Sequence, residues 1–269
     1  MAQSVQYIET RTGKLAYRTV GSGDGPPLLM AQRFRGTLDD WDPAFVARLA
    51  SRRSVVMFDS AGIGRSEGEV PTSIAGIADV AADFAKAIGL KQVDLLGWSL
   101  GGLIAQQVAL NYPDLVRRLI VAGSSPGGIS DGPKQHPKVQ QVMSNPVNSE
   151  EDFLFLFFPE TDTGRTAGRA YYARLQQIED RGPPVSASSF VNQIKAFSSW
   201  SGVRDRLGEL KMPVLVANGQ HDVMIPAYRS YVLANEVANG KLVLYPDAGH
   251  AFLFQYAEEF AAEVDRFLS

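Results

Sequence analysis

The sequence predicts an α/β fold in which a mostly parallel central sheet is covered by helices. Three observations lead to this prediction: short continuous apolar runs recur along the chain, helical stretches separate them, and loops rich in Gly and Pro divide the elements. Strands that are apolar on both faces indicate a parallel sheet buried on both sides. The 269 residues, 45% of them hydrophobic and 20% charged, are enough for a sizeable core.

The expected strands begin with a hairpin and continue as buried runs. The hairpin turns at Thr12-Gly13, and the apolar or alternating patterns place eight strands in all, over residues 7–9, 15–19, 28–31, 55–58, 93–96, 116–122, 214–217 and 242–245. Helices are expected between them. Asp42 followed by Pro43 starts one that runs to Ala50, and Ser73 starts one that runs to Ile88. Later helices follow Pro226 and cover residues 257–268.

Residues 126–200 interrupt this alternation. The stretch begins Pro126-Gly127-Gly128, carries many prolines, and has helical patterns without buried strands. We expect a core formed by residues 1–125 and 201–269, and a helical cap or lid, residues 126–200, inserted after the sixth strand. Such an insertion would lie over the carboxyl ends of the strands, where open α/β sheets bind ligands. Its aromatic side chains either pack it onto the core or line a substrate cavity; the candidates for substrate contact are Phe153, Phe157, Tyr171 and Trp200.

Composition excludes several kinds of function. The chain has no cysteine, so disulfides, thiolate catalysis and cysteine–zinc sites are absent, which is compatible with the cytoplasm, our expected location. A net charge of −3 gives no reason to expect nucleic acid or an anionic membrane as a partner. No secretory pattern, membrane-length apolar run, phosphate-binding loop or metal-ligand spacing is evident. We therefore expect a small-molecule substrate and no cofactor or metal, and leave the oligomeric state open.

One motif indicates nucleophilic catalysis. Gly97-Trp98-Ser99-Leu100-Gly101 lies between an apolar strand and a helix, and the G-x-S-x-G spacing presents a serine at a sharp strand-to-helix turn. The first helical turn aims free N–H groups at negative charge that forms beside Ser99. Trp98, next to this serine, is a further candidate for substrate contact. A serine hydroxyl is a weak nucleophile, so a base and an orienting acid are required elsewhere.

His250 and Asp222 are the expected partners of Ser99. His250 follows the last expected strand, so it would lie at the same sheet edge as Ser99 and could exchange a proton at neutral pH. Asp222 ends another strand and would accept the imidazole N–H, which sets the tautomer. His221 is a weaker alternative base, and Asp247 a competing acid that fits a turn better.

The order Ser99, Asp222, His250 on strand ends resembles the α/β-hydrolase superfamily, in its serine-nucleophile branch. The segment from Asp59 to Ser66 is similar to the D-x-x-G-x-G-x-S segment of that family. The resemblance covers nearly the whole chain, although the insertion matches only in position. It implies an α/β-hydrolase fold and an oxyanion hole built from two backbone N–H groups.

The loop expected to supply one of these donors departs from the family pattern. The N–H of Leu100 is one donor, and by position the N–H of Phe34 is the other, but Gln32-Arg33 stands where the family usually has His-Gly. Gln32 can keep the hydrogen-bonding role of the histidine. Arg33 either points to solvent, so that Arg33→Ala would barely change turnover, or it or Arg35 leans into the pocket and attracts a carboxylate or enolate. A damaged oxyanion hole is the third reading.

The function expected from these residues is a serine hydrolase that cleaves an ester, thioester or lactone of a small, fairly apolar compound through an acyl-enzyme. Two other activities would use the same three residues: carbon–carbon bond hydrolysis of a diketone, and metal-free perhydrolysis (haloperoxidase activity). A non-enzymatic alternative is a small-molecule receptor with a hydrolase fold. A serine nucleophile argues against the dehalogenases and epoxide hydrolases of the superfamily, which use a carboxylate.

Overall fold

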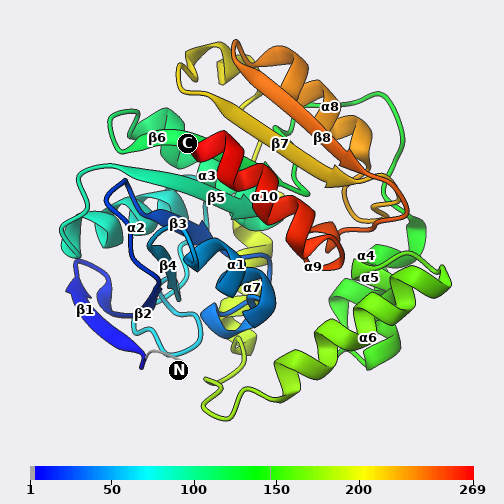
Figure 1. The fold of residues 1–269 in the computed structure, drawn as a ribbon, viewed down its shortest axis with the longest axis horizontal. Coiled ribbons are helices and arrows are strands. Elements are labelled where there is room, and N and C mark those ends of the chain that lie inside the picture. The colour runs from blue at the N-terminus through cyan, green and yellow to red at the C-terminus, as the bar shows by residue number, and fades with distance from the viewer. Residues whose placement is uncertain (1–3, 146) are drawn as a thin grey trace.

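The computed structural model describes residues 4–145 and 147–269, and its centre is an eight-stranded sheet (Figure 1). The strand order is β1-β2-β4-β3-β5-β6-β7-β8. Each strand found corresponds to one expected from the apolar runs, within a few residues at the ends. The strands are β1 (Gln6–Thr10), β2 (Gly13–Val20), β3 (Leu28–Ala31), β4 (Val55–Phe58), β5 (Val93–Trp98), β6 (Val116–Ala122), β7 (Val214–Gly219) and β8 (Gly240–Tyr245).

The sheet is mostly parallel. The hairpin of β1 and β2 is antiparallel and joins β4 antiparallel, whereas every pairing from β4 through β3, β5, β6 and β7 to β8 is parallel. The strand order changes direction at β3, since β4 lies on one side of β3 and β5 on the other. The carboxyl end of β5 therefore borders the crevice where α/β sheets bind ligands. The expected fold class is therefore confirmed.

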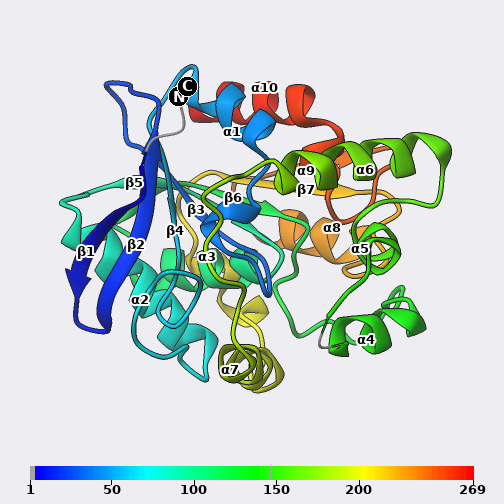
Figure 2. The ribbon, with the colours of Figure 1, turned by 90° about the horizontal axis from the view of Figure 1, so that it is seen from below.

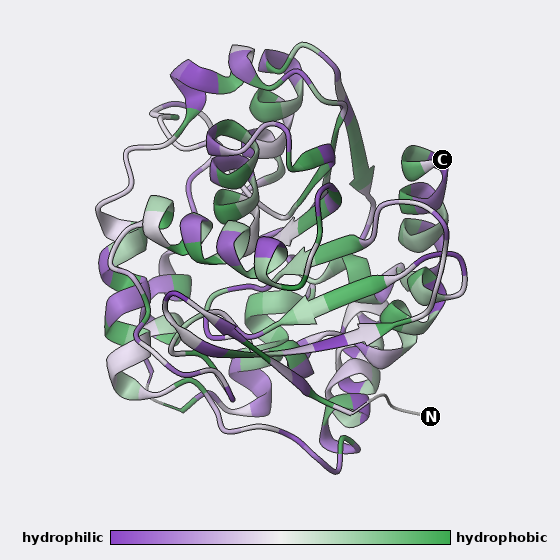
Figure 3. Ribbon diagram, turned by 90° about the vertical axis from the view of Figure 1, so that its left-hand side faces the viewer, coloured by the Kyte–Doolittle hydropathy of each residue, from purple (hydrophilic) through white to green (hydrophobic). Residues whose placement is uncertain are grey.

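Helices cover both faces of the sheet. In Figure 2, α1 (Pro43–Ala50) and α10 (Ala257–Leu268) lie above the sheet and α2 (Ile74–Ala87) lies below it. The helix α3 (Leu100–Asn111) packs against α2, and α8 (Ala227–Glu236) packs against β7 and β8. Figure 3 shows the strands as mainly hydrophobic and the outer helix surfaces as mixed, as a sheet buried on both faces requires.

Two of these helices begin as their sequences predict. The Asp42 side chain accepts the Ala44 N–H, and the Ser73 side chain accepts the Gly76 N–H. Each satisfies one of the donors that a helix leaves unpaired in its first turn. A short helix that the sequence analysis did not anticipate, α9 (Phe252–Gln255), follows the loop of His250 and buries its three apolar residues against α6 and α10.

Residues 126–200, here called the inserted segment, connect β6 to β7. Its described residues form helices and no strand: α4 (Pro137–Ser144), α5 (Glu150–Phe157), α6 (Asp162–Gln176) and α7 (Ala187–Ser198). Figure 2 shows that α4, α5 and α6 lie to one side of the sheet, whereas α7 lies below it near α2. The aromatic cluster of α5 and α6 packs on α9, since Tyr171 stacks on Phe254 with ring centroids 4.5 Å apart.

The inserted segment is joined to the core through three aspartates that follow β3. Arg174 forms a two-pronged ion pair with Asp42, and Arg181 pairs with Asp40. The Gly182 N–H donates to Asp39 over 2.9 Å. These carboxylates are almost fully buried, and charge-assisted hydrogen bonds of this kind are the strong ones. The contacts therefore hold α6 and the chain after it in one position over the sheet edge.

Candidate active site

Ser99 occupies a strained turn between β5 and α3. Its φ is 59° and its ψ is −119°, a conformation that residues with a side chain rarely adopt. The surroundings hold it there, because the Ser99 N–H donates to Ala122 over 2.9 Å and its carbonyl accepts the Ser124 hydroxyl at 2.8 Å. The side chain therefore stands above the carboxyl end of the sheet, as the G-x-S-x-G spacing predicts.

The glycines on both sides of Ser99 permit a very close approach of backbone segments. A Cβ atom on Gly97 would lie 2.0 Å from the carbonyl oxygen of Gly101, and a Cβ on Gly101 would lie 2.0 Å from that of Ala31. Both distances are far inside van der Waals contact. No other residue type fits at these two positions without displacement of the helix α3.

The structure brings Asp222 and His250 into direct contact. The loop after β7 carries Asp222, and the loop after β8 carries His250; the Asp222 Oδ2 lies 2.6 Å from the His250 Nδ1. The other carboxylate oxygen accepts the N–H groups of Met224 and Ile225, at 2.8 and 2.9 Å. Both side chains are fully buried. The carboxylate is thus fixed in orientation and aimed at one ring nitrogen.

The second ring nitrogen of His250 is left available. Its Nε2 is buried and makes no hydrogen bond to the described part of the chain. Trp98 supports the histidine from below, because its indole N–H donates to the His250 carbonyl over 3.0 Å. The Ser99 hydroxyl and the His250 Nε2 are therefore not hydrogen-bonded to each other here, and contacts of this kind often tighten only when substrate is bound.

Two backbone N–H groups near Ser99 can act as oxyanion donors. Leu100 is the first residue of α3, so its N–H has no partner within the helix. The Phe34 N–H, in the loop after β3, has no acceptor among the described residues. Gln32 braces this loop: its Oε1 accepts the Arg33 N–H at 2.8 Å and its Nε2 donates to the Thr37 carbonyl at 3.1 Å.

The backbone strain in this loop falls on Arg35. Arg33, which stands where the family usually has glycine, does not need a positive φ, whereas Arg35 has a φ of 57°. The Arg35 N–H donates to the side chain of Gln193, on α7 of the inserted segment, over 3.1 Å. Gln193 therefore holds this loop in its strained shape from outside the core. The sequence does not indicate this role of Gln193, since nothing in α7 alone shows what the residue contacts.

We expect Gln193→Leu to lower kcat on an ester by about tenfold, because a small displacement of an oxyanion donor is costly. The variant Gln193→Glu keeps an oxygen acceptor and should retain most of the activity. Steady-state kinetics with a para-nitrophenyl ester measure both. Equal kcat values for Gln193→Leu and the wild type would show that the loop keeps its shape without this contact.

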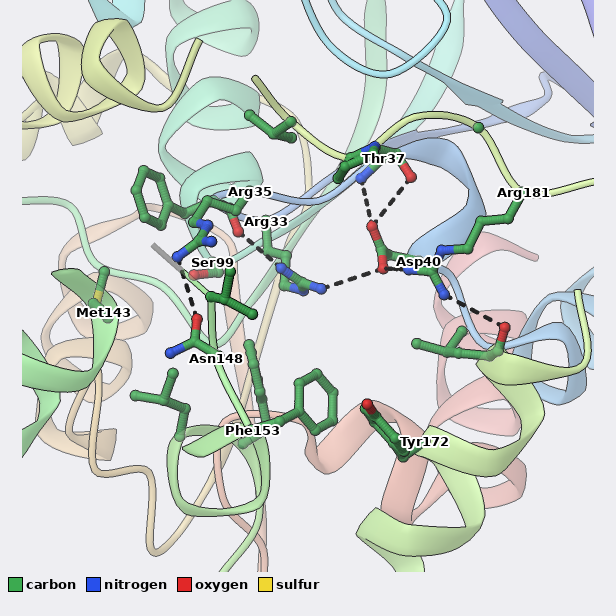
Figure 4. A pocket seen from close by; sticks show the side chains of 18 of the residues that line it. Arg33, Arg35, Thr37, Asp40, Ser99, Met143, Asn148, Phe153, Tyr172 and Arg181 are labelled. Atoms are coloured by element: carbon green, nitrogen blue, oxygen red, sulfur yellow. Dashed lines mark hydrogen bonds and ion pairs between the residues drawn. The ribbon is translucent and has the colours of Figure 1, made fainter. Parts of the chain in front are cut away.

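Arg33 does not point to solvent, and that orientation, one of the readings from the sequence, is wrong. Its side chain is only 11% exposed and lies over the rings of Phe157 and Trp98, at 5.1 and 5.7 Å. One guanidinium nitrogen donates to the Phe34 carbonyl over 2.9 Å, and another lies 3.4 Å from Asp40. The aromatic faces and this carboxylate together outweigh hydration of the cation. Figure 4 shows the side chain directed across the pocket toward Asp40.

Two of the residues expected to contact substrate do not line the pocket. Trp98 and Tyr171 are fully buried, and neither lines a cavity beside Ser99. Trp98 belongs to β5 and packs beneath the site, whereas the Tyr171 hydroxyl donates to the Asp40 carbonyl over 2.7 Å. The neighbouring Tyr172 faces the pocket instead (Figure 4). A helical pattern alone does not tell which of two adjacent tyrosines faces inward.

Two cavities meet at Ser99. One, of about 590 Å³, extends over α5 and α6 and is lined by Phe153 and Phe157, as expected for substrate contacts. The other, of about 310 Å³, extends toward α7 and is lined by Trp200. Ser99 and Phe34 border both cavities, so a group bound to Ser99 has space on two sides.

The Asp59–Ser66 loop supports the site from the side of β4. Asp59 is fully buried, and its carboxylate accepts the N–H groups of Leu38 and Arg65 at 2.7 and 3.0 Å. Ser66 donates to the Asp59 carbonyl over 2.6 Å and closes the loop. Burial raises the pKa of the Asp59 carboxyl to about 6, against the opposing effect of the two N–H donors.

The raised pKa of Asp59 predicts that its protonation stabilises the fold. The folded protein binds this proton more tightly than the unfolded chain does. The resulting contribution to the free energy of unfolding is complete below pH 4 and is lost as the pH rises through 6. It amounts to roughly 3 kcal/mol at most. Carboxyl carbon NMR should show a resonance with a midpoint near pH 6 that is missing in Asp59→Asn. A midpoint near pH 4 for that resonance would contradict the assignment.

Among residues 4–145 and 147–269, no group of three or more His, Asp or Glu side chains is arranged to hold a metal ion. No helix in the described chain has both the length and the apolar character needed to cross a bilayer.

The fold agrees with comparisons to known proteins. The family model of the alpha/beta hydrolase fold matches residues 26–256, so the chain belongs to this family and is a hydrolase. The chain is 33% identical to an alpha/beta hydrolase fold protein from Chitinophaga pinensis, with a TM-score of 0.90 over 100% of this chain and 98% of that one.

Curated relatives are more distant in sequence. The chain is 27% identical to a pimeloyl-[acyl-carrier protein] methyl ester esterase from Nitrosomonas europaea, over 91% of this chain and 96% of the relative. It is 26% identical to the serine hydrolase BPHL of Mus musculus, over 94% of this chain and 82% of the relative. Both relatives are hydrolases by name.

Proposed function

We propose that this protein is a serine hydrolase that cleaves an ester, thioester or lactone of a small molecule through an acyl-enzyme. The observation that carries the proposal is the buried Asp222–His250 pair, whose free Nε2 lies at the same sheet edge as the strained Ser99. The esterase and serine hydrolase names among the relatives support the same class of reaction.

The proposed reaction starts at the Ser99 hydroxyl. Its oxygen attacks the substrate carbonyl while the His250 Nε2 takes the proton, and Asp222 holds the opposite N–H and stabilises the imidazolium. The N–H groups of Phe34 and Leu100 would bind the oxyanion. His250 then returns the proton to the leaving alcohol. Water attacks the acyl group next, with His250 again taking the proton, and Ser99 regains its proton as the acid product leaves.

We propose that the inserted segment acts as a cap on a core formed by residues 1–125 and 201–269. Its described residues supply much of both cavity walls, including Phe153, Phe157 and Trp200. The cap would separate the site from bulk solvent and determine which substrates enter. A small-molecule substrate and a cytoplasmic location, both expected from the sequence, stay predictions.

Carbon–carbon bond hydrolysis of a diketone is the second candidate. The observation that favours it is the position of Arg33, which faces the larger cavity, where an anionic enolate could bind. The same three side chains would serve, with His250 acting first on a carbon acid. A panel of esters, a thioester, a lactone and a diketone acid separates the two activities.

Labelling with a fluorophosphonate probe tests the proposed chemistry directly. We expect one equivalent of probe on Ser99, identified by peptide mass spectrometry, and no labelling of the His250→Ala variant. The variant His136→Ala is the control, because His136 is exposed and caps α4. Absence of labelling in the wild type, with small substrates also unreacted, would favour the receptor function instead.

A further inference from the structure

The two cavities that meet at Ser99 differ in charge. The larger one is here called the arginine chamber. Its charged lining residues, among those described, are Arg33, Arg35, Arg181 and one carboxylate, Asp40. Among the described residues, the smaller one, here called the aromatic chamber, has one charged lining residue, Arg229, beside a wall that is mainly apolar. The apolar wall is formed by Leu103, Met143, Ile194, Phe197, Trp200, Met224 and Ile225.

We infer that the substrate is an anionic ester, whose carboxylate occupies the arginine chamber while its other arm occupies the aromatic chamber. This inference rests on the proposed function, because it takes Ser99 as the point where the two arms of the substrate join. It narrows the substrate from a small, fairly apolar compound to a monoanion with an apolar arm.

The charge balance within the arginine chamber is the first argument. Arg33 and Arg181 share a single partner, since both contact the same oxygen of Asp40 (Figure 4). The other oxygen of Asp40 accepts the Thr37 N–H at 2.7 Å and the Thr37 hydroxyl at 3.1 Å. One carboxylate therefore faces two guanidinium groups, and the lining described for the chamber carries more positive than negative charge.

The fixed position of Arg33 is the second argument. Its guanidinium contacts both the Phe157 ring and the Asp40 carboxylate. These contacts hold the guanidinium in place beside the cavity before a ligand binds. Arg35 lines the same cavity as Arg33, and its pKa is lowered chiefly by burial and further by the charge of Arg33. A carboxylate placed between such groups forms short, charge-assisted hydrogen bonds and relieves their repulsion.

The aromatic chamber sets the second arm. Its wall of Ile194, Phe197 and Trp200 offers dispersion contacts and little hydrogen bonding, which suits an alkyl or aryl group. A carboxylate in this chamber would meet one guanidinium, that of Arg229, against three in the arginine chamber, so less of its lost hydration would be replaced. The two chambers therefore favour one orientation of a substrate with one charged arm and one neutral arm.

Matched esters test the preference. Mono-para-nitrophenyl glutarate carries the carboxylate on the acyl arm, and para-butyryloxybenzoate carries it on the alcohol arm. Their neutral counterparts are para-nitrophenyl pentanoate and para-tolyl butyrate. We expect one of the anionic esters to exceed its neutral counterpart in kcat/KM by at least about tenfold, with the ratio falling as ionic strength rises. Ratios at or below one for both pairs would overturn the inference.

Two arginine variants separate charge recognition from support of the fold. Arg181→Gln should reduce the anionic-to-neutral ratio of kcat/KM about tenfold, and Arg181→Lys should restore part of it. Arg174→Gln is the matched control, because Arg174 joins the same segment to Asp42 but does not line the chamber. The control should leave the ratio unchanged. An equal loss in both variants would indicate that only the attachment of the segment matters, and would overturn the inference.

Binding of dicarboxylates tests the chamber without catalysis. Calorimetry with succinate, glutarate and adipate on the Ser99→Ala variant should detect saturable binding of at least one of them, lost in Ser99→Ala/Arg181→Gln. If binding is found but no ester reacts, the proposed function fails and the arginine chamber stands as an anion-binding site. If esters react but no dicarboxylate binds and anionic esters are not preferred, the inference fails and the proposed function stands.

Discussion

Ser99→Ala is expected to lower kcat on an ester substrate by about a millionfold, to the residual rate that oxyanion donors and binding alone provide. The alanine removes the only atom that we propose to form a bond to the substrate. It keeps the backbone turn, although the φ of 59° stays strained for any residue with a Cβ. Single-turnover kinetics with a para-nitrophenyl ester measure the loss.

The matched control for this variant is Ser125→Ala. Ser125 also borders the aromatic chamber, but its hydroxyl accepts the Gly127 N–H and belongs to no proposed step. Its kcat should stay near that of the wild type. Both variants should keep the circular dichroism spectrum of the wild type. Retention of more than about one per cent of kcat in Ser99→Ala would mean that another group is the nucleophile.

Asp222→Asn is expected to lower kcat by about ten-thousandfold. The carboxylate accepts two backbone N–H groups with one oxygen and contacts the His250 Nδ1 with the other. An amide whose oxygen keeps the backbone contacts turns its NH₂ group toward Nδ1. This arrangement favours the tautomer that carries the proton on Nε2, which cannot take a proton from Ser99.

The competing acid of the sequence analysis supplies the control. Asp247 lies in the same loop as His250 but has a φ of 48° and makes a turn, so Asp247→Asn should leave kcat within a few-fold of the wild type. Asparagine tolerates this left-handed backbone, which limits any effect on folding. If Asp247→Asn caused the larger loss, Asp247 would be the orienting acid and the contact of Asp222 with His250 would be structural.

The sheet and the positions of Ser99, Asp222 and His250 could be predicted because they depend on local patterns. Apolar runs mark β5, β7 and β8, and the three residues follow the ends of these strands. Parallel strands direct their carboxyl ends to one edge, so strand assignment alone brings distant residues together. Strand assignment was therefore enough to predict that Asp222 and His250 lie close together.

The walls of the pocket could not be predicted in the same way. The orientation of Arg33 depends on Asp40, Phe157 and Trp98, and these contacts involve separate parts of the chain. The choice between Tyr171 and Tyr172 depends on how α6 is rotated, and the Tyr171 hydroxyl donates to the Asp40 carbonyl, far away in the sequence. Side-chain direction at such positions is a property of tertiary packing and has no local signal.

The inserted segment forms hydrogen bonds with three loops of the proposed active site, those of Asp222, His250 and Phe34. The His136 N–H donates to Val223 beside the acid, the Phe157 carbonyl accepts the Ala251 N–H beside the histidine, and Gln193 holds the loop of Phe34. Selection of the substrate and alignment of the chemistry are thus built into the same stretch of chain. A descendant that exchanges this stretch to gain a new substrate must rebuild these three anchors to keep its full rate.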